Sequence, residues 1–194
     1  MVAQPDRLLM SVEDYLTLDR NSTEVRYEFI DGYAYLLAGG TADHSTIKQN
    51  IANLIRGPLR GGPCRVYDSD MKVRISKTRY VYPDVSVSCD PHDRGRTDIL
   101  QSPRLVVEVL SPSTEAKDRG KKFSYYRACP TIEEYVLVDT QQQSVEVYQR
   151  EQAPFWRFSS FGPGGHMELT SLNIRFPVAA IYEDVTFPED TADS

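Results

Sequence analysis

The chain has 194 residues, of which 40% are hydrophobic and 26% are charged, and its formal net charge is −6 at pH 7. This length and balance are typical of one globular domain with a sizeable core. The acidic charge argues against a protein that coats nucleic acid, because phosphate contacts need clustered Lys and Arg. It does not exclude an enzyme whose acidic site holds a divalent cation.

The cellular setting is indicated by what the sequence lacks. No apolar run approaches the roughly 20 residues needed to span a bilayer, and the N-terminus does not have the pattern of a secretory signal. The three cysteines, Cys64, Cys89 and Cys129, are odd in number and widely spaced, which predicts neither a zinc site nor a disulfide framework. We therefore expect a protein of the reducing cytoplasm that does not bind membranes.

The first predicted elements are a short helix and a hairpin. Residues 10–16 read as a helix for which Ser11 is the candidate N-cap. The strand-like runs 26–30 and 33–37 flank Asp31-Gly32. That dipeptide favours a tight turn, because both of its residues tolerate positive φ.

The central part of the chain predicts one long helix and several strands. Apolar residues recur at helical spacing over 44–59, and the helix is expected to stop at Gly57-Pro58 or at Gly61-Gly62. Three strand-like runs follow it, over 64–75, 80–88 and 105–110. The last run is almost wholly apolar, as expected for a central strand that is buried on both faces.

The C-terminal part predicts a second helix and more strands. The helix covers 115–128 and stops before Pro130. The later predictions are strands over 135–138 and 145–148, a final hairpin around 162–165, an apolar segment over 178–182 and a disordered acidic tail over 188–194. The order of elements predicts an α/β or α+β fold with one mixed central sheet, in a single domain over 1–187.

Two carboxylates stand in runs of strand-forming residues. Asp84 follows Tyr82-Pro83, and Glu108 interrupts an otherwise apolar strand. A buried ionised carboxylate is costly unless it is compensated. A salt bridge, from Arg74 or Arg104 in the case of Glu108, would compensate it, and so would a hard cation shared by the two acids. Alternatively, Asp84 caps local backbone groups.

A lysine on the next helix can join these acids. Asp118, Lys122 and either Tyr125 or Tyr126 are three to four residues apart, so they share one helical face. Lys122 could bind a phosphate oxygen or orient an attacking water, or it could be a solvated lysine. Tyr126 could position a substrate or pack beside Phe123.

These motifs resemble a known group of enzymes. Pro83-Asp84, the run Glu108-Val-Leu-Ser-Pro-Ser-Thr114 and the segment Asp118-Arg-Gly-Lys-Lys122 resemble the PD-(D/E)xK nuclease superfamily. More narrowly they resemble the Uma-two family of bacterial restriction-endonuclease-like proteins. The resemblance covers nearly the whole chain and includes 27–32, His44-Ser45 and 135–139.

The resemblance implies a restriction-endonuclease-like fold and a magnesium site, with manganese as an alternative. Asp84, Glu108 and the backbone carbonyl of Val109 would hold the metal. The superfamily's lysine, two residues after the acid, would fall on Leu110, so this family's lysine lies on the following helix. Lys122 is the match.

Further site residues are implied in the same way. Lys121 is adjacent to Lys122, so the lysine assignment has a one-residue ambiguity. Glu28 and His44 would join the metal end of the site, and Asp118 and Tyr126 would support it.

Three functions follow from these observations. The first is a magnesium-dependent endonuclease that hydrolyses DNA phosphodiester bonds, expected to act as a homodimer because symmetric dimers are the commonest oligomers. The second is a catalytically silent nuclease-fold module for nucleic-acid binding or protein assembly. The third is a hydrolase that uses the two carboxylates as an acid/base pair, as glycosidases do, and it leaves the lysine without a role.

Overall fold

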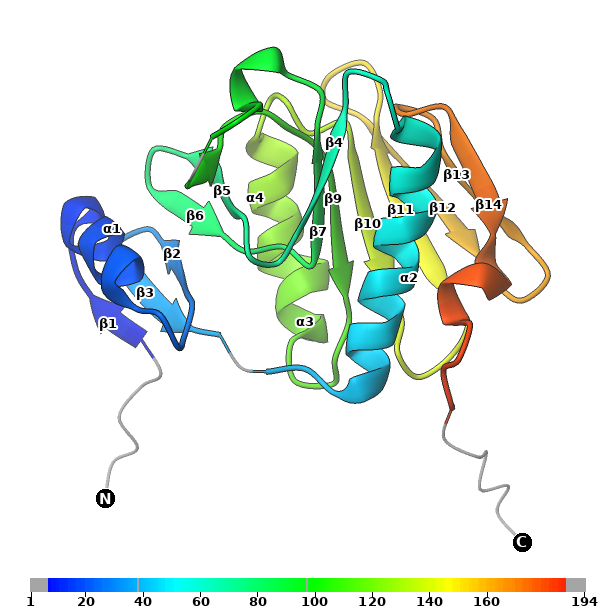
Figure 1. Ribbon diagram of the computed structural model, residues 1–194, viewed down its shortest axis with the longest axis horizontal. Coiled ribbons are helices and arrows are strands. Elements are labelled where there is room, and N and C mark those ends of the chain that lie inside the picture. Colours follow the sequence, from blue (N-terminus) through cyan, green and yellow to red (C-terminus); the bar gives the residue numbers. More distant parts are fainter. Residues whose placement is uncertain (1–6, 38, 97, 188–194) are drawn as a thin grey trace, which may run out of the picture.

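The computed structural model describes residues 7–37, 39–96 and 98–187, and it shows a mixed α+β fold (Figure 1). Its strands form two six-stranded sheets and one two-stranded sheet. The predicted fold class is confirmed, but the strands are not gathered into one sheet as the sequence suggested. The predicted disordered tail, 188–194, lies outside the described residues.

The first sheet contains the N-terminal hairpin and is covered by the first helix. Its strand order is β1-β3-β2-β6-β5-β8. Its strands are β1 (Arg7–Leu9), β2 (Tyr27–Ile30), β3 (Tyr33–Leu36), β5 (Lys72–Ser76), β6 (Arg79–Val81) and β8 (Ile99–Leu100). Helix α1 (Val12–Asn21) packs on it through Tyr15, whose ring stacks on Phe29 with centroids 4.9 Å apart. The predicted turn is confirmed, with φ of 48° at Asp31 and 94° at Gly32.

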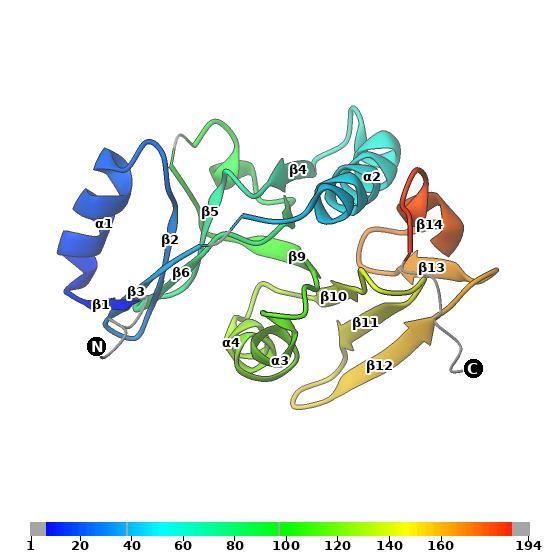
Figure 2. The same ribbon diagram turned by 90° about the horizontal axis from the view of Figure 1, so that it is seen from below.

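The second sheet is mixed and lies between helices. Its strand order is β12-β11-β10-β9-β7-β4, and only β9 and β10 are parallel among its pairs of described strands. Its strands are β4 (Arg65–Asp68), β7 (Val85–Ser88), β9 (Pro103–Val109), β10 (Glu134–Val138), β11 (Val145–Arg150) and β12 (Trp156–Phe161). Helix α2 covers one face and α3 with α4 the other (Figure 2). As predicted, β9 is the buried central strand.

Helix α2 (Ala42–Leu59) forms the largest core with this sheet. Its residues Ile47, Ile51 and Ile55 are all 0% exposed and pack with the inward side chains of the strands. The helix continues through Pro58, so the later of the two predicted stops is correct. Gly61, with φ of 77°, follows the end of the helix and supplies the left-handed backbone that favours glycine.

Two predicted strands are each divided between the sheets. The run 64–75 becomes β4 and β5, and the run 80–88 becomes β6 and β7. The second division falls at Pro83-Asp84, where the chain passes from the first sheet to the second. Strand propensity is the same in either sheet, so the sequence pattern could not show these divisions.

The predicted final hairpin around 162–165 is wrong. Strand β12 pairs with β11, whereas β13 (His166–Leu169) pairs with β14 (Ile174–Pro177) in the two-stranded sheet. The glycine-rich turn therefore connects two sheets. The apolar segment forms a short 3₁₀ helix, η3 (Val178–Tyr182), which packs on α2.

The predicted helix over 115–128 has an interruption in its regular winding. It consists of α3 (Glu115–Lys117), a π-helical turn η2 (Asp118–Lys122) and α4 (Phe123–Ala128), and it ends before Pro130 as expected. A π-helical turn inserts extra backbone into a helix, so its side chains point in directions that α-helical periodicity does not predict.

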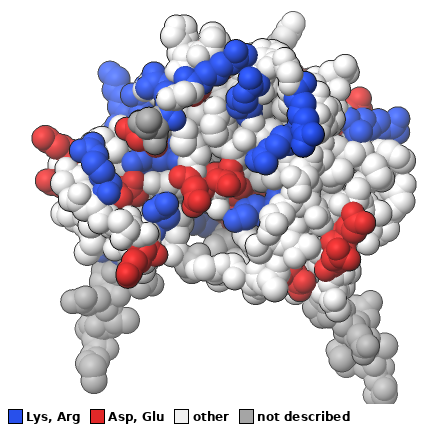
Figure 3. Space-filling model, in the orientation of Figure 1, with Lys and Arg blue, Asp and Glu red and all other residues white. Residues whose placement is uncertain are grey.

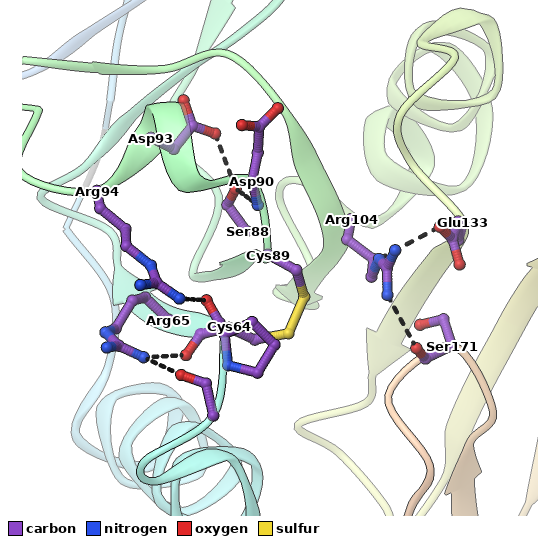
Figure 4. Close-up of a disulfide and its surroundings, with 12 residues drawn as sticks. Cys64, Arg65, Ser88, Cys89, Asp90, Asp93, Arg94, Arg104, Glu133 and Ser171 are labelled. Carbon is purple, nitrogen blue, oxygen red and sulfur yellow. Dashed lines mark hydrogen bonds and ion pairs between the residues drawn. A yellow bond between two sulfur atoms is a disulfide. The ribbon is translucent and has the colours of Figure 1, made fainter.

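Cys64 and Cys89 form a disulfide, which corrects the expectation that no disulfide is present (Figure 4). Antiparallel pairing of β4 with β7 places Arg65 opposite Ser88, so the two adjoining cysteines meet, with Cα atoms 3.9 Å apart. The two cysteines are 25 residues apart in the sequence, so no local motif indicates that they pair. Cys129 remains a free, buried thiol.

The disulfide predicts a thiol count. The chain unfolded without reductant should expose one reactive thiol, from Cys129, and the reduced chain should expose three. Because the bond closes a loop, reduction should also lower the free energy of unfolding by about 2–4 kcal/mol. Thiol titration and urea unfolding measure the two effects, and three thiols in the unreduced chain would contradict the bond.

Candidate active site

Strand pairing brings the two predicted carboxylates to one end of the second sheet. Strand β7 runs antiparallel to β9, with Val85 opposite Val107. Asp84 directly precedes Val85 and Glu108 directly follows Val107. In an antiparallel pair of strands this places the two acids side by side, one residue beyond the last paired residues. Of the two acids expected on neighbouring strands, Glu108 lies on β9 and Asp84 lies in the bend directly before β7. The start of α2 and the segment α3–η2–α4 pack around this end.

Asp84 is held by backbone and by a histidine. Its Oδ2 accepts a hydrogen bond of 2.8 Å from the N–H of Val109, and Nε2 of His44 lies 3.4 Å from the same oxygen. The histidine Nε2 also lies 3.1 Å from the carbonyl oxygen of Val109. The contact with Asp84 raises the pKa of the His44 imidazole, and burial and Lys48 oppose this rise. His44 therefore stands beside Asp84, where the resemblance expected it.

The backbone before α2 fixes the position of this histidine. Thr41 caps the helix, and its Oγ1 accepts a hydrogen bond of 3.2 Å from the N–H of His44. A Cβ atom on Gly40 would lie 2.8 Å from Nδ1 of His44, so the imidazole occupies space that only a glycine leaves open. A Cβ on Gly39 would have no atom within 4 Å.

Glu108 is buried, with only 6% of its side chain exposed. Its Oε1 accepts hydrogen bonds from Nζ of Lys122 at 2.9 Å and from the hydroxyl of Tyr126 at 2.6 Å. Burial raises the pKa of Glu108 to about 8, against the influence of Lys122. The cation beside it is thus a lysine; Arg74 donates instead to Gln101, and Arg104 pairs with Glu133.

Lys122 is surrounded by three carboxylates. Its Nζ lies 2.9 Å from Glu108 Oε1, 3.0 Å from Glu28 Oε1 and 3.5 Å from Asp118 Oδ1, and its side chain is 8% exposed. Burial lowers the pKa of the ammonium, but these carboxylates outweigh burial and raise the pKa well above its ordinary value. Lys121 is exposed, so Lys122 is the one of these two neighbouring lysines that lies in the cluster.

Glu28 links the first sheet to this cluster. It lies on β2, is 0% exposed, and its Oε2 accepts a hydrogen bond of 2.9 Å from Nζ of Lys117. Burial favours a raised pKa, but Lys122 and Lys117 outweigh it and hold the pKa of Glu28 below its ordinary value. Sequence reasoning missed Lys117, because a lysine five residues before Lys122 lies on another face of a regular α-helix.

The site holds more carboxyl groups than ammonium groups. The four carboxyl groups of Glu28, Asp84, Glu108 and Asp118 accompany two ammonium groups, those of Lys117 and Lys122. A divalent cation would offset this excess.

The open oxygens of the two acids fit such a cation. From the described residues, neither Oδ1 of Asp84 nor Oε2 of Glu108 accepts a hydrogen bond, whereas the other oxygen of each is fixed. In the same part of the chain, no group of three or more His, Cys, Asp or Glu side chains is placed so that it could hold a metal ion. Magnesium commonly uses only one or two carboxylates and keeps several waters, so the residues present fit it.

The comparisons with known proteins show the family of this chain. Residues 12–178 match the Uma2 family, described as "Putative restriction endonuclease". The chain belongs to the Uma2 family. The expected family resemblance is thereby confirmed, and it includes the segments that carry Glu28, Asp84, Glu108 and Lys122.

Two relatives come from the cyanobacterium Synechocystis. The chain is 38% identical over 179 residues to "Uncharacterized protein slr1290", with 92% of this chain and 94% of the relative covered. It is 30% identical over 178 residues to "Uncharacterized protein sll1609", with coverage of 90% and 99%. Both matches extend over nearly the full length of the Uma2 fold.

A solved structure has the same fold. It is described as "a putative nuclease belonging to DUF820" from Anabaena variabilis, and it superposes with a TM-score of 0.74 at 19% sequence identity. The match covers 90% of this chain and 98% of the other. The restriction-endonuclease-like nuclease fold expected from the sequence is therefore shown.

The contact between Gly40 and His44 predicts a test of the histidine's placement. Gly40→Ala should push the imidazole away from Asp84 and Val109, because the new Cβ would overlap Nδ1. The pKa of His44 should then fall toward its ordinary value of about 6.5, as measured by NMR titration of the metal-free protein.

Gly39→Ala is the matched control, because it adds the same methyl group where nothing lies within 4 Å. Its His44 should titrate as in the unchanged protein. Equal titration in both variants would mean that Gly40 does not hold the imidazole in place.

Proposed function

We propose that this Uma2 protein is a nuclease that uses magnesium, or manganese, to hydrolyse phosphodiester bonds of DNA. The observation that carries the proposal is the arrangement of Asp84 and Glu108. Asp84 directly precedes β7 and Glu108 lies on the adjacent strand β9, and each has one oxygen fixed by protein donors and one left open.

The residues that would hold the metal are Asp84, Glu108 and the carbonyl oxygen of Val109. That carbonyl has two lone pairs, so the contact with His44 leaves one available. The bound cation would lower the pKa of a water molecule and offset negative charge on the phosphoryl group.

The surrounding residues orient these ligands. The N–H of Val109 and the imidazole of His44 fix Oδ2 of Asp84, and Lys122 with Tyr126 fixes Oε1 of Glu108. Such partners restrict the rotation of a ligand and direct its second oxygen, and their loss typically costs about 10–100-fold in metal affinity or activity. In this proposal Lys122 acts by positioning Glu108.

A groove beside the site offers a place for the nucleic-acid backbone. It has a volume of about 420 Å³ and runs along α2, which begins at the site with His44. Figure 3 shows lysines and arginines over this helix with acidic side chains beside them, and two acids, Asp68 and Asp70, line the groove itself. The residues that line the groove are Ser45, Lys48, Gln49, Ala52, Asn53, Arg56, Asp68, Ser69 and Asp70.

The groove brings two cations, Lys48 and Arg56, to one side of the site, opposite the acids Asp68 and Asp70. Lys48 and Arg56 are eight residues apart on α2, which corresponds to about 12 Å along the helix. Lys48 also lies close enough to His44 to affect its pKa. A local pair of cations leading to the site is what phosphate contacts require, even when the whole protein is acidic.

Isosteric changes of the two acids test the catalytic proposal. Asp84→Asn and Glu108→Gln preserve side-chain size and remove the carboxylate that would bind the cation, so each should lower DNA cleavage at least about 100-fold. Plasmid cleavage with magnesium or manganese measures the loss, and manganese binding measured by calorimetry should weaken in parallel. EDTA should stop cleavage by the unchanged protein.

Asp31→Asn is the control, because Asp31 lies in the turn between β2 and β3 with 46% of its side chain exposed. It should cut as fast as the unchanged protein. If Asp84→Asn also cuts at that rate, the catalytic assignment is wrong. If the unchanged protein binds DNA in EDTA and cuts no DNA form with any metal, the silent nuclease-fold module is correct instead.

The groove predicts a separate loss of binding. Arg56→Ala should weaken binding to a short DNA duplex several-fold and make it less sensitive to salt, because one phosphate contact is lost. Fluorescence anisotropy at several salt concentrations measures both effects. Lys77→Ala, an exposed lysine between β5 and β6 that does not line the groove, should have no effect; equal behaviour of the two variants would contradict this path for the DNA.

The homodimer remains part of the proposal, since two-fold symmetric DNA sites suit two-fold symmetric proteins. Light scattering of the purified protein measures its mass in solution.

Within the described ranges 7–37, 39–96 and 98–187, no helix is both long and apolar enough to cross a membrane.

A further inference from the structure

We propose that Lys117 is the lysine of this site that contacts the substrate, by donating to a phosphate oxygen next to the bond that is cut. This inference rests on the proposed function and refines it. Lys122, the lysine that matches the family motif, then serves as the residue that positions Glu108.

The contacts of Lys122 leave it little access to a substrate. Its Nζ donates a hydrogen bond to Glu108 and lies within ion-pair distance of the carboxylates of Glu28 and Asp118. Its side chain is 8% exposed. A phosphate could reach it only by displacing a buried carboxylate, which would leave that charge without its partner.

Lys117 has the access to solvent that Lys122 lacks. Its Nζ makes one ion pair, 2.9 Å from Oε2 of Glu28, and no other among the described residues. The side chain is 38% exposed, so its remaining N–H donors reach solvent at the rim of the site. The ring of Tyr35 lies beneath, with its centroid 5.5 Å from Nζ, and restricts where the ammonium can go.

The π-helical turn explains how both lysines reach one glutamate. Residues five apart in an α-helix point about 140° away from each other. In η2 the N–H of Phe123 bonds to the carbonyl of Asp118, five residues earlier. This winding places residues five apart above one another, so Lys117 and Lys122 both point at Glu28.

Glu28 acts as the bridge between the two lysines. It is completely buried, and its oxygens divide between them, with Oε1 near Lys122 and Oε2 bonded to Lys117. A carboxylate fixed in this way holds the inner ammonium on Glu108 and the outer ammonium at the opening. In this arrangement Lys122 orients the metal ligand Glu108, and Lys117 contacts the phosphate.

DNA binding without cleavage tests this assignment. The probe is a short fluorescent DNA duplex, measured with calcium in place of magnesium. Where calcium does not support hydrolysis, the duplex stays intact while its affinity is measured. Lys117→Met should weaken binding about tenfold and reduce the slope of log K against log salt concentration by about 0.9, the value for one phosphate contact. Lys117→Arg should restore most of the slope.

Lys121→Met is the matched control, since Lys121 is an exposed lysine of the same helical segment. It should keep the slope of the unchanged protein. A purely structural role for Lys117 would lower the midpoint of urea unfolding and leave the salt slope unchanged, and that result would overturn the proposal.

The outcome is separable from the catalytic proposal. If the unchanged protein binds but cuts with no metal, while Lys117→Met lowers the slope, the lysine contact stands and the nuclease activity fails. If the unchanged protein cuts and Lys117→Met binds with the same slope, only the lysine contact fails. If the unchanged protein does not bind DNA, both are wrong.

Discussion

The structure depends on one buried ammonium group, that of Lys122. It meets Glu108 of the second sheet, Glu28 of the first sheet and Asp118 of its own helical segment. Removing one partner from a buried ion cluster commonly costs about 3–5 kcal/mol, because it leaves an uncompensated charge. The two sheets and the interrupted helix are therefore held in one relative arrangement, and that arrangement defines the site.

The same packing fixes one oxygen of each acid of the site and leaves the other oxygen open. Lys122 and Tyr126 immobilise one oxygen of Glu108, while Val109 and His44 immobilise one oxygen of Asp84. The second oxygens are left open at the same end of the sheet. In the proposed metal site, these oxygens would therefore be oriented before a cation arrives, so little reorganisation would be needed on binding.

Particular residues show how far sequence reasoning reached. Glu108 stood out because a charged residue in a buried apolar strand needs compensation, and Asp84 because it shares that context. His44 and Glu28 came only from the family resemblance, since nothing in their neighbours indicates burial at a common site. Lys117 was missed because α-helical periodicity does not hold across the π-helical turn, and the Cys64–Cys89 bond because two cysteines 25 residues apart meet only through strand pairing.

The sequence by itself determined which segments are helices and which are strands, that β9 is buried, that Asp84 and Glu108 are the two candidate acids, and the family. These are local properties, or they are written in short motifs. Tertiary structure alone decided which strands share a sheet, that Pro83-Asp84 is the crossing between sheets, and which lysine is enclosed and which is open. The physical reason is that burial and ion pairing depend on segments far apart in the chain, such as β2 and η2, whose contact no local pattern records.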